Sequence, residues 1–113
     1  MDIRELTEEM HAFVRAKGWY KTDSLRPQTM RNLAISLCLE AGEVLEHFQW
    51  NEEPVDQVEL ANELADVTLY LLQLASLSGI DLEKAILSKL KSNYDRTWDQ
   101  IPNQSTQEET KLP

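Results

Sequence analysis

The sequence predicts an all-α protein whose four helices pack in a bundle-like arrangement. Apolar residues recur at helical spacing in four separate segments. The segments are divided by Gly18, by Pro54 and by Gly79, which are residues that end helices or form turns. No segment has the pattern of a parallel sheet or of a Gly-rich phosphate loop. The 113 residues are enough for one domain with a modest core.

The first helix is expected over residues 2–17, and Gly18 can stop it. Its apolar residues form one stripe, which consists of Ile3, Leu6, Met10, Phe13 and Val14. Residues 19–28 follow and contain Trp19 and Tyr20 beside basic residues and Pro27. Two large aromatic side chains do not stay fully solvated, so this segment is expected to be an ordered loop.

The second helix is expected to begin near residues 27–29 and to run to about Phe48, and a polar turn around Pro54 follows. The third is expected from residue 55 or 56 to Ser78. It has one apolar stripe, made of Leu60, Leu64, Val67, Leu71 and Leu74. Because this helix is apolar over more than one stripe, part of its surface is expected to meet another subunit, and dimerisation would complete the bundle.

The fourth helix is expected to be capped by Asp81 and to end between residues 94 and 98. After Trp98, which is interpreted as a packing anchor, the sequence becomes rich in Pro, Gln, Thr and Glu and has no period. We therefore expect one domain over residues 1–98 and a polar, mobile tail over residues 99–113.

Composition excludes several classes of protein. The formal net charge of −9 argues against a nucleic-acid polymer as partner, because phosphate backbones need a basic surface. No apolar run approaches the roughly 20 residues that span a bilayer, and no signal peptide is visible, so no membrane partner and a cytoplasmic location are expected. The single cysteine, Cys38, excludes an internal disulfide framework and a cysteine-based zinc site, and it is expected in the core.

Two carboxylate pairs carry the chemical signal. They are Glu40-x-x-Glu43 in the second helix and Glu63-x-x-Asp66 in the third. Residues three apart share one helix face, so each pair presents two carboxylates in the same direction. The alternative is that each pair lies on an ordinary solvated face. Both pairs stand among apolar residues, however, where unpaired negative charge is costly, and a metal ion would supply the positive charge.

The ligand set indicates which metal to expect. All-oxygen ligation favours Mg²⁺, or Mn²⁺, over iron or zinc. Ferritin-like di-iron bundles use Glu-x-x-His, whereas His47 follows Glu43 by four residues. Mg²⁺ held by several carboxylates with open water positions usually serves a phosphate substrate.

The pattern resembles the MazG-like nucleoside triphosphate pyrophosphohydrolases, and most closely their dCTP pyrophosphatase branch. The resemblance covers about residues 6–98. Its supporting stretches are residues 31–33, 40–43, Glu46, 48–50, 63–67, Tyr70, 88–90 and Asn93. The loop between Trp19 and Arg31 is longer than in that branch.

The resemblance implies hydrolysis of a (deoxy)nucleoside triphosphate, dCTP-like or a modified pyrimidine nucleotide, to the monophosphate and pyrophosphate, as nucleotide-pool house-cleaning. It implies that the four carboxylates are Mg²⁺ ligands and that one of them also acts on the attacking water. We also expect a homodimer or a homotetramer. The carboxylates in question are Glu40, Glu43, Glu63 and Asp66.

The resemblance also implies substrate contacts. Lys89 and Asn93 would contact phosphate or sugar. The alternative for Lys89, to which we give equal weight, is an ordinary exposed lysine. Trp19 and Trp50 are implied to hold the base, with Phe48 and Asn32 as weaker candidates. Tyr70 is a further residue implied in substrate binding. The alternative for the tryptophans is that they close the bundle ends or a subunit interface.

Two histidines are left over. His11 has no carboxylate motif around it and is interpreted as a surface residue, whereas His47 is a candidate partner for the carboxylates of the same helix. The rival function is a non-catalytic helical interaction or dimerisation module with a vestigial carboxylate cluster, and a di-iron protein is a third reading. Thermal stability that rises with Mg²⁺ would favour a real metal site.

Overall fold

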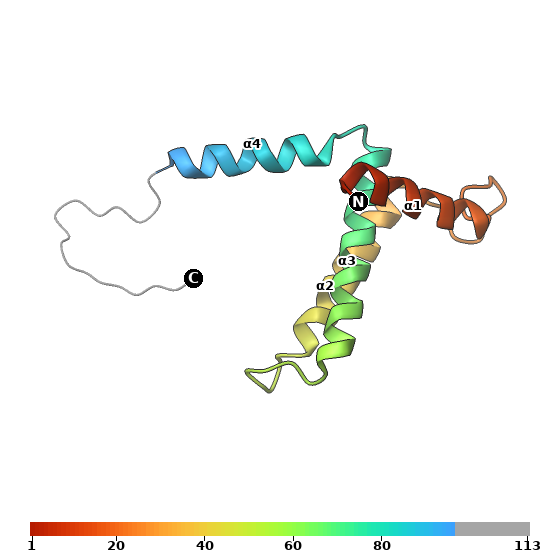
Figure 1. Cartoon of the computed structure of the whole chain (residues 1–113). Coiled ribbons are helices and arrows are strands. Elements are labelled where there is room, and N and C mark those ends of the chain that lie inside the picture. Colours follow the sequence, from red (N-terminus) through yellow and green to blue (C-terminus); the bar gives the residue numbers. More distant parts are fainter. Residues whose placement is uncertain (97–113) are drawn as a thin grey trace. The chain divides into compact units, whose positions relative to one another are not determined.

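The computed structural model describes residues 1–96, and within that range the chain forms four helices and no strand (Figure 1). They are α1 (Ile3–Ala16), α2 (Met30–Glu46), α3 (Gln57–Leu77) and α4 (Leu82–Asp95). The predicted all-α class is confirmed. The interpretation of Trp98, the domain boundary after residue 98 and the expected tail concern positions outside the described residues.

Local capping explains where α1 begins and where α1 and α3 end. Asp2 and Glu5 form a capping box, in which each side chain accepts a hydrogen bond from the other's backbone N–H, at 2.8 and 2.9 Å. Gly18 has φ 73° and follows the α1 C-cap, while the backbone N–H of Trp19 reaches back to the carbonyl of Val14. Gly79, with φ 72°, ends α3 in the same way. Both predicted stops are confirmed.

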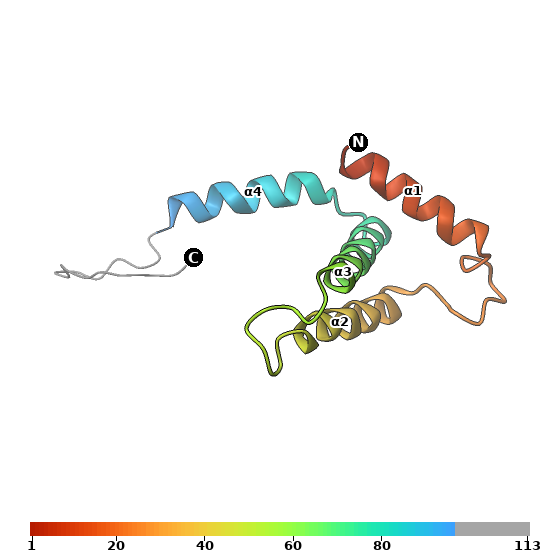
Figure 2. The ribbon, with the colours of Figure 1, turned by 60° about the horizontal axis from the view of Figure 1, so that its bottom comes forward.

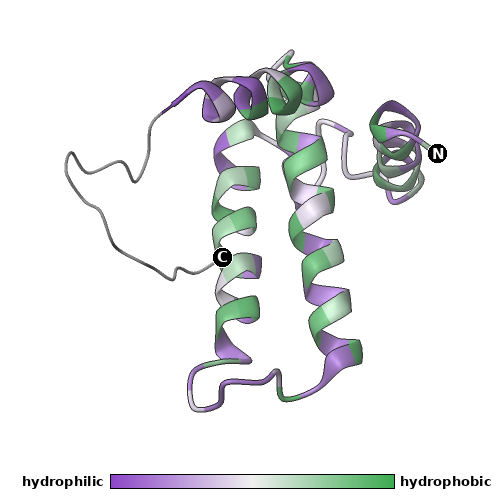
Figure 3. Cartoon of the chain, turned by 60° about the vertical axis from the view of Figure 1, so that its left-hand side comes forward, coloured by the Kyte–Doolittle hydropathy of each residue, from purple (hydrophilic) through white to green (hydrophobic). Residues whose placement is uncertain are grey.

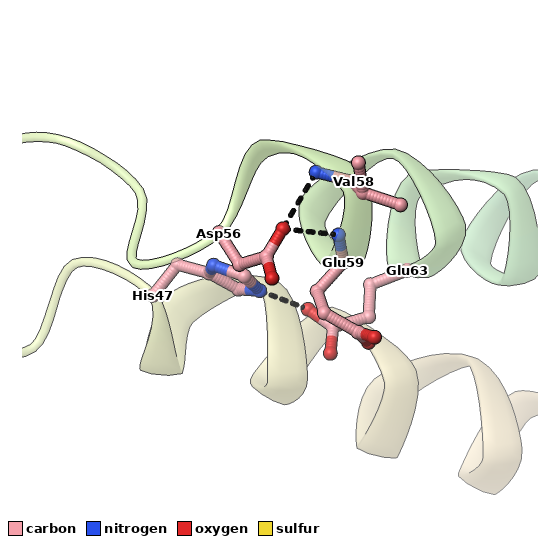
Figure 4. A network of polar contacts seen from close by, with 5 residues as sticks. All are labelled: His47, Asp56, Val58, Glu59 and Glu63. Atoms are coloured by element: carbon pink, nitrogen blue, oxygen red, sulfur yellow. Dashed lines mark hydrogen bonds and ion pairs between the residues drawn. The ribbon is translucent and has the colours of Figure 1, made fainter.

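The starts of α2 and α3 depend on single oxygen-bearing side chains. Thr29 precedes α2 and accepts a hydrogen bond from the backbone N–H of Asn32 at 3.1 Å. Asp56 precedes α3 and accepts from the backbone N–H groups of Val58 and Glu59 at 2.9 and 3.3 Å (Figure 4). The predicted starts are therefore within a few residues of the observed ones, and α2 ends at Glu46, two residues earlier than expected.

The chain forms two compact units, of which the first is Met1–Glu83 and the second begins at Lys84. In the first unit α2 and α3 run antiparallel, side by side, and α1 packs on α3 (Figures 1 and 2). The buried apolar residues come from all three helices and are Met10, Val14, Leu33, Leu72 and Ala75. Nearly all of α4 belongs to the second unit.

Many apolar side chains of α2 and α3 stay accessible in the single chain, and hydrophobic residues recur along the length of both helices (Figure 3). The predicted stripe of α3 is only partly covered in the single chain: Leu64 and Leu71 are 49% and 42% exposed, while Leu72, outside the stripe, is buried. Cys38 is exposed rather than in the core. The reason is that within the described unit α3 covers only one side of α2, so a residue in an apolar run can still face outward.

No helix in the described part of the chain combines the length and the hydropathy that crossing a bilayer requires.

Candidate functional site

The four predicted carboxylates come from two helices that pack on each other, with Glu40 and Glu43 on α2 and Glu63 and Asp66 on α3. Burial raises the pKa of the Glu40 carboxyl, and the negative charges of Glu43, Asp66 and Glu63 raise it further. Each of the other three carboxylates is therefore close enough to Glu40 to repel it. The α2–α3 contact therefore brings carboxylates of both helices near Glu40.

The chemistry of this cluster fits a hard divalent cation. All four groups are carboxylates, which are the ligands that Mg²⁺ prefers. In the described part of the chain no lysine or arginine forms an ion pair with them. No three His, Cys, Asp or Glu side chains among residues 1–96 converge at metal-binding distance. A cation bound here would therefore require these carboxylates to move closer together.

Among the described residues, His47 forms a hydrogen bond with one carboxylate of the cluster. Its Nε2 lies 2.6 Å from Oε1 of Glu63, so a residue just past α2 holds a carboxylate of α3 (Figure 4). The ring is 7% exposed, and its Nδ1 is buried without a hydrogen-bond partner in the described residues. The predicted role of His47 as a partner of the carboxylates is confirmed, but helix packing brings its ring to Glu63 of α3 rather than to Glu40 or Glu43 of its own helix.

A cavity of about 620 Å³ opens beside the cluster. Its walls come from α1, from the loop of residues 19–28, from α2 and from α3. We call it the main cavity. Three of the predicted substrate-binding residues line it, namely Trp19, Asn32 and Tyr70, and Asp66 connects it to the carboxylates. Its volume lies within the range of about 300–1,000 Å³ that small-molecule sites occupy.

The two tryptophans that could hold a base differ in position. The Trp19 ring meets the Phe13 ring edge to face, with centroids 5.6 Å apart, and the Arg26 guanidinium lies 5.4 Å from its centroid. The loop of residues 19–28 is thus ordered around its aromatic residues, as expected. Trp50, in contrast, is 85% exposed and lies outside the main cavity, as does Phe48. The structure does not bring Trp50 to Trp19 within one chain.

Lys89 and Asn93 lie on α4, in the second unit. They keep the helical spacing that the sequence indicated, with Lys89 exposed and Asn93 partly buried. Their contact with a substrate stays a prediction.

Sequence reasoning missed a polar network beside the main cavity. His11, interpreted as a surface residue, bonds through Nδ1 to the Tyr20 hydroxyl at 2.6 Å and through Nε2 to Ser76 Oγ at 2.7 Å. Gln73, 3% exposed, joins the network through Tyr20. A signal was present, because His11 continues the four-residue spacing of Ile3 and Thr7, which are also partly buried. Likewise, Gln73 continues the helical line through Asp66 and Tyr70.

Comparisons with known proteins point to one family. The dCTP pyrophosphatase 1 of Homo sapiens is 33% identical to this chain over an aligned length of 121 residues. The alignment covers 99% of this chain and 66% of that protein. The Bos taurus protein of the same name is 36% identical over 104 residues, covering 84% of this chain and 57% of its own length. This chain therefore spans between 56% and 66% of the length of these curated relatives.

A solved structure agrees with the sequence matches. A crystal structure of a pyrophosphatase from Archaeoglobus fulgidus superposes with a TM-score of 0.64 at 31% sequence identity, covering 80% of this chain and 87% of that one. A model of the MazG-like family matches residues 35–111, which is more than half of the chain. The chain belongs to the MazG-like family.

Proposed function

We propose that this chain hydrolyses (deoxy)nucleoside triphosphates to the monophosphate and pyrophosphate in a reaction that depends on Mg²⁺, with Mn²⁺ as a possible substitute. One observation carries the proposal: four carboxylates on two packed helices, three of which add to the raised pKa of Glu40, adjoin a cavity of about 620 Å³, and Asp66 belongs to both. The names of the relatives, dCTP pyrophosphatase and pyrophosphatase, support the reaction type. The name of the curated relatives favours dCTP-like nucleotides as substrates, and we extend the proposal to modified pyrimidine nucleotides.

The metal would be held by Glu40, Glu43, Glu63 and Asp66. A bound divalent cation lowers the pKa of water and neutralises charge on phosphate oxygens, so little covalent chemistry is left to the protein. Carboxylates on opposite helices can hold positive charge on two sides of a phosphate group. This suits attack of water at the α-phosphorus with release of pyrophosphate in one step.

The remaining task of the chain is to orient groups. His47 fixes the direction of the Glu63 carboxylate through the 2.6 Å contact. The nucleoside would enter the main cavity, with its triphosphate toward Asp66 and its base toward Trp19, Asn32 and Tyr70. Lys89 and Asn93 would contact phosphate or sugar, and Trp50, being accessible, would have to reach the base from a rearranged loop or from another subunit.

Assembly into a homodimer or a homotetramer is part of the proposal. Large apolar side chains of α2 and α3 are accessible in the single chain, among them Leu39 at 64%, Leu45 at 69% and Val58 at 69%. Several such residues on two neighbouring helices are typical of a subunit interface. Light scattering during size-exclusion chromatography should give a mass of two or four chains. A monomer at micromolar concentration would contradict the assembly.

The activity is tested by screening nucleoside triphosphates for released pyrophosphate, with Mg²⁺ and with EDTA. We expect pyrophosphate from at least one pyrimidine nucleotide and none with EDTA. Asp66→Asn is the matched control for contaminating enzymes, because it changes one ligand and keeps the side-chain shape. A chain that hydrolyses no nucleotide and is not stabilised by Mg²⁺ would instead be the interaction module that the sequence left open. We further propose a role in nucleotide-pool house-cleaning and a cytoplasmic location.

A further inference from the structure

Five polar side chains form one continuous hydrogen-bonded network beside the main cavity. It runs from Gln28 in the loop through Gln73 on α3 to Tyr20, then to His11 on α1 and finally to Ser76 on α3. The network ties the loop of residues 19–28 to two helices. The proposed reaction uses none of its members, although Gln28 and Gln73 line the main cavity.

The direction of each hydrogen bond can be worked out from the loop end. Gln28 donates through Nε2 to the backbone carbonyl of Arg26 at 2.6 Å. Its Oε1 therefore accepts, and the donor is Nε2 of Gln73 at 2.7 Å. The same Nε2 also donates to the Tyr20 hydroxyl oxygen at 3.2 Å. A carboxamide nitrogen has two hydrogens, so both donors of Gln73 are used within the protein.

The other end of the network agrees with this direction. Because the Tyr20 oxygen accepts from Gln73, its own hydrogen is available for Nδ1 of His11. His11 then carries its hydrogen on Nε2 and donates it to Ser76 Oγ. This requires a neutral His11, and burial, with a smaller effect from the Arg15 charge, lowers the pKa of His11 accordingly. Every bond in the network has one donor and one acceptor.

The consequence concerns the oxygen of Gln73. Oε1 accepts no hydrogen bond from the residues that the structure describes, and it is not among the fully buried polar atoms that lack a partner. It therefore keeps accessible surface, although Gln73 is only 3% exposed, and the main cavity is the space that Gln73 lines. A buried amide whose donors are both occupied thus presents an acceptor to the cavity.

Asn32 repeats the pattern on α2. Its Nδ2 donates to the backbone carbonyl of Pro27 at 3.0 Å, and its Oδ1 has no hydrogen bond in the described residues. Asn32 also lines the main cavity. Two carboxamides on facing helices therefore turn their nitrogens toward the loop of residues 19–28, and each leaves an oxygen for a ligand.

The position of Gln73 suits contact with a base. Asp66, Tyr70 and Gln73 follow one another along α3 and all line the main cavity. Gln73 is seven residues beyond Asp66, which corresponds to about 10 Å along the helix axis. That distance is comparable with the separation of the phosphate and the base edge within one nucleotide. A nucleotide with its phosphates at Asp66 would bring its base to the two amide oxygens.

We propose that Gln73, together with Asn32, is a specificity-determining residue that selects a base with an exocyclic amino group, as cytosine has at position 4, over a base with an oxo group there. The proposal rests on the proposed function for the placement of the phosphates. An amino group donates to the amide oxygens, whereas the 4-oxo group of uracil or thymine would set an acceptor against two acceptors. A buried polar group left without a partner is the basis of strong substrate discrimination.

The test compares kcat/KM for dCTP and dUTP in the full chain, in Gln73→Met and in Tyr20→Phe. Gln73→Met keeps the length of the side chain and removes the acceptor, so the dCTP-to-dUTP ratio should fall about tenfold, as expected for one hydrogen bond. Tyr20→Phe is the matched control, because it removes a neighbouring bond of the same network and leaves Oε1 in place. Its ratio should equal that of the unaltered chain.

Several results would overturn the proposal. One is an unchanged ratio in folded Gln73→Met, and another is an equal fall of the ratio in Tyr20→Phe, which would assign selectivity to the position of the loop. A substrate-side comparison does not depend on variants: the 2-pyrimidinone deoxyribonucleoside triphosphate, with hydrogen at position 4, should rank between dCTP and dUTP. If the unaltered chain has the same kcat/KM for this analogue as for dCTP, no acceptor in the cavity recognises the amino group.

The same experiment separates this proposal from the proposed function. If no nucleoside triphosphate is hydrolysed, the proposed function fails, and dissociation constants for dCMP and dUMP still measure selectivity without catalysis. Tighter binding of dCMP that is lost in Gln73→Met would support the role of Gln73, and equal binding of the two monophosphates would refute it.

Discussion

Replacing His47 with leucine should weaken Mg²⁺ binding without unfolding the protein. His47 holds Glu63 through a 2.6 Å contact between Nε2 and Oε1. Loss of a residue that orients a metal ligand typically lowers metal affinity about 10- to 100-fold. That range corresponds to about 1.4–2.8 kcal/mol, which matches the roughly 1.5–3 kcal/mol attributed to one hydrogen bond to a charged group.

The effect on stability without metal should be small. His47→Leu loses the bond to Glu63, but Glu63 keeps 18% of its side-chain surface and can be hydrated. The substitution also removes the buried Nδ1, which has no partner in the described residues and costs about 1–3 kcal/mol. The two changes oppose each other, so the free energy of unfolding in EDTA should shift by less than about 1 kcal/mol.

The assay is the Mg²⁺ dependence of pyrophosphate release, with thermal melting in EDTA and in Mg²⁺ as a second readout. Glu59→Gln is the matched control, because it removes a negative charge one turn before Glu63 and does not touch the bond of His47 to Glu63. Its apparent Mg²⁺ affinity should change little, since an exposed charge is screened. The reasoning is refuted if folded His47→Leu binds Mg²⁺ as tightly as the unaltered chain.

Three further predictions concern other parts of the site. Glu63→Gln or Asp66→Asn should abolish turnover while leaving the melting temperature in EDTA equal or higher. The reason is that each variant removes one of the charges that, after burial, raise the pKa of Glu40, and so relieves repulsion in the metal-free state. A variant that is unfolded in EDTA would contradict the prediction. The pKa of His11 is lowered from 6.5, so the unfolded chain binds more protons than the folded chain below that pH. The free energy of unfolding should therefore fall as the pH drops from about 6.5 toward the folded pKa, a dependence that urea titrations should find weakened in His11→Asn. Trp19→Ala should raise KM more than it lowers kcat, since stacking contributes about 1–3 kcal/mol per base, and steady-state kinetics showing mainly a lower kcat would contradict a base-binding role.

The helix ends could be predicted from sequence because their causes are local. Gly18 and Gly79 adopt positive φ, and Thr29 and Asp56 cap the helices that follow them. The predicted helix ends therefore lie within a few residues of the observed ones. The pairing of Glu40 with Glu43 is equally local, because helical spacing alone puts both on one face. These features need no knowledge of how the helices pack.

What sequence reasoning missed depends on packing between helices. Cys38 and Leu64 stand in apolar runs, yet both are exposed in the single chain, because one neighbouring helix covers only one face. The partner of His47 is on α3, which its own helix could not reveal. Gln73 was overlooked although helical spacing places it in line with Asp66 and Tyr70, because its partners, Tyr20 and Gln28, lie in a distant loop that only packing brings to α3.

The most direct test of the central claim is to follow oxygen from water into the products. The reaction would be run in ¹⁸O-labelled water with Mg²⁺ and dCTP, and the products would be separated and analysed by mass spectrometry. Attack at the α-phosphorus predicts that the label appears in the nucleoside monophosphate and that pyrophosphate is unlabelled. Label in pyrophosphate or in orthophosphate would contradict the proposed reaction and the placement of the α-phosphate among Glu40, Glu43, Glu63 and Asp66.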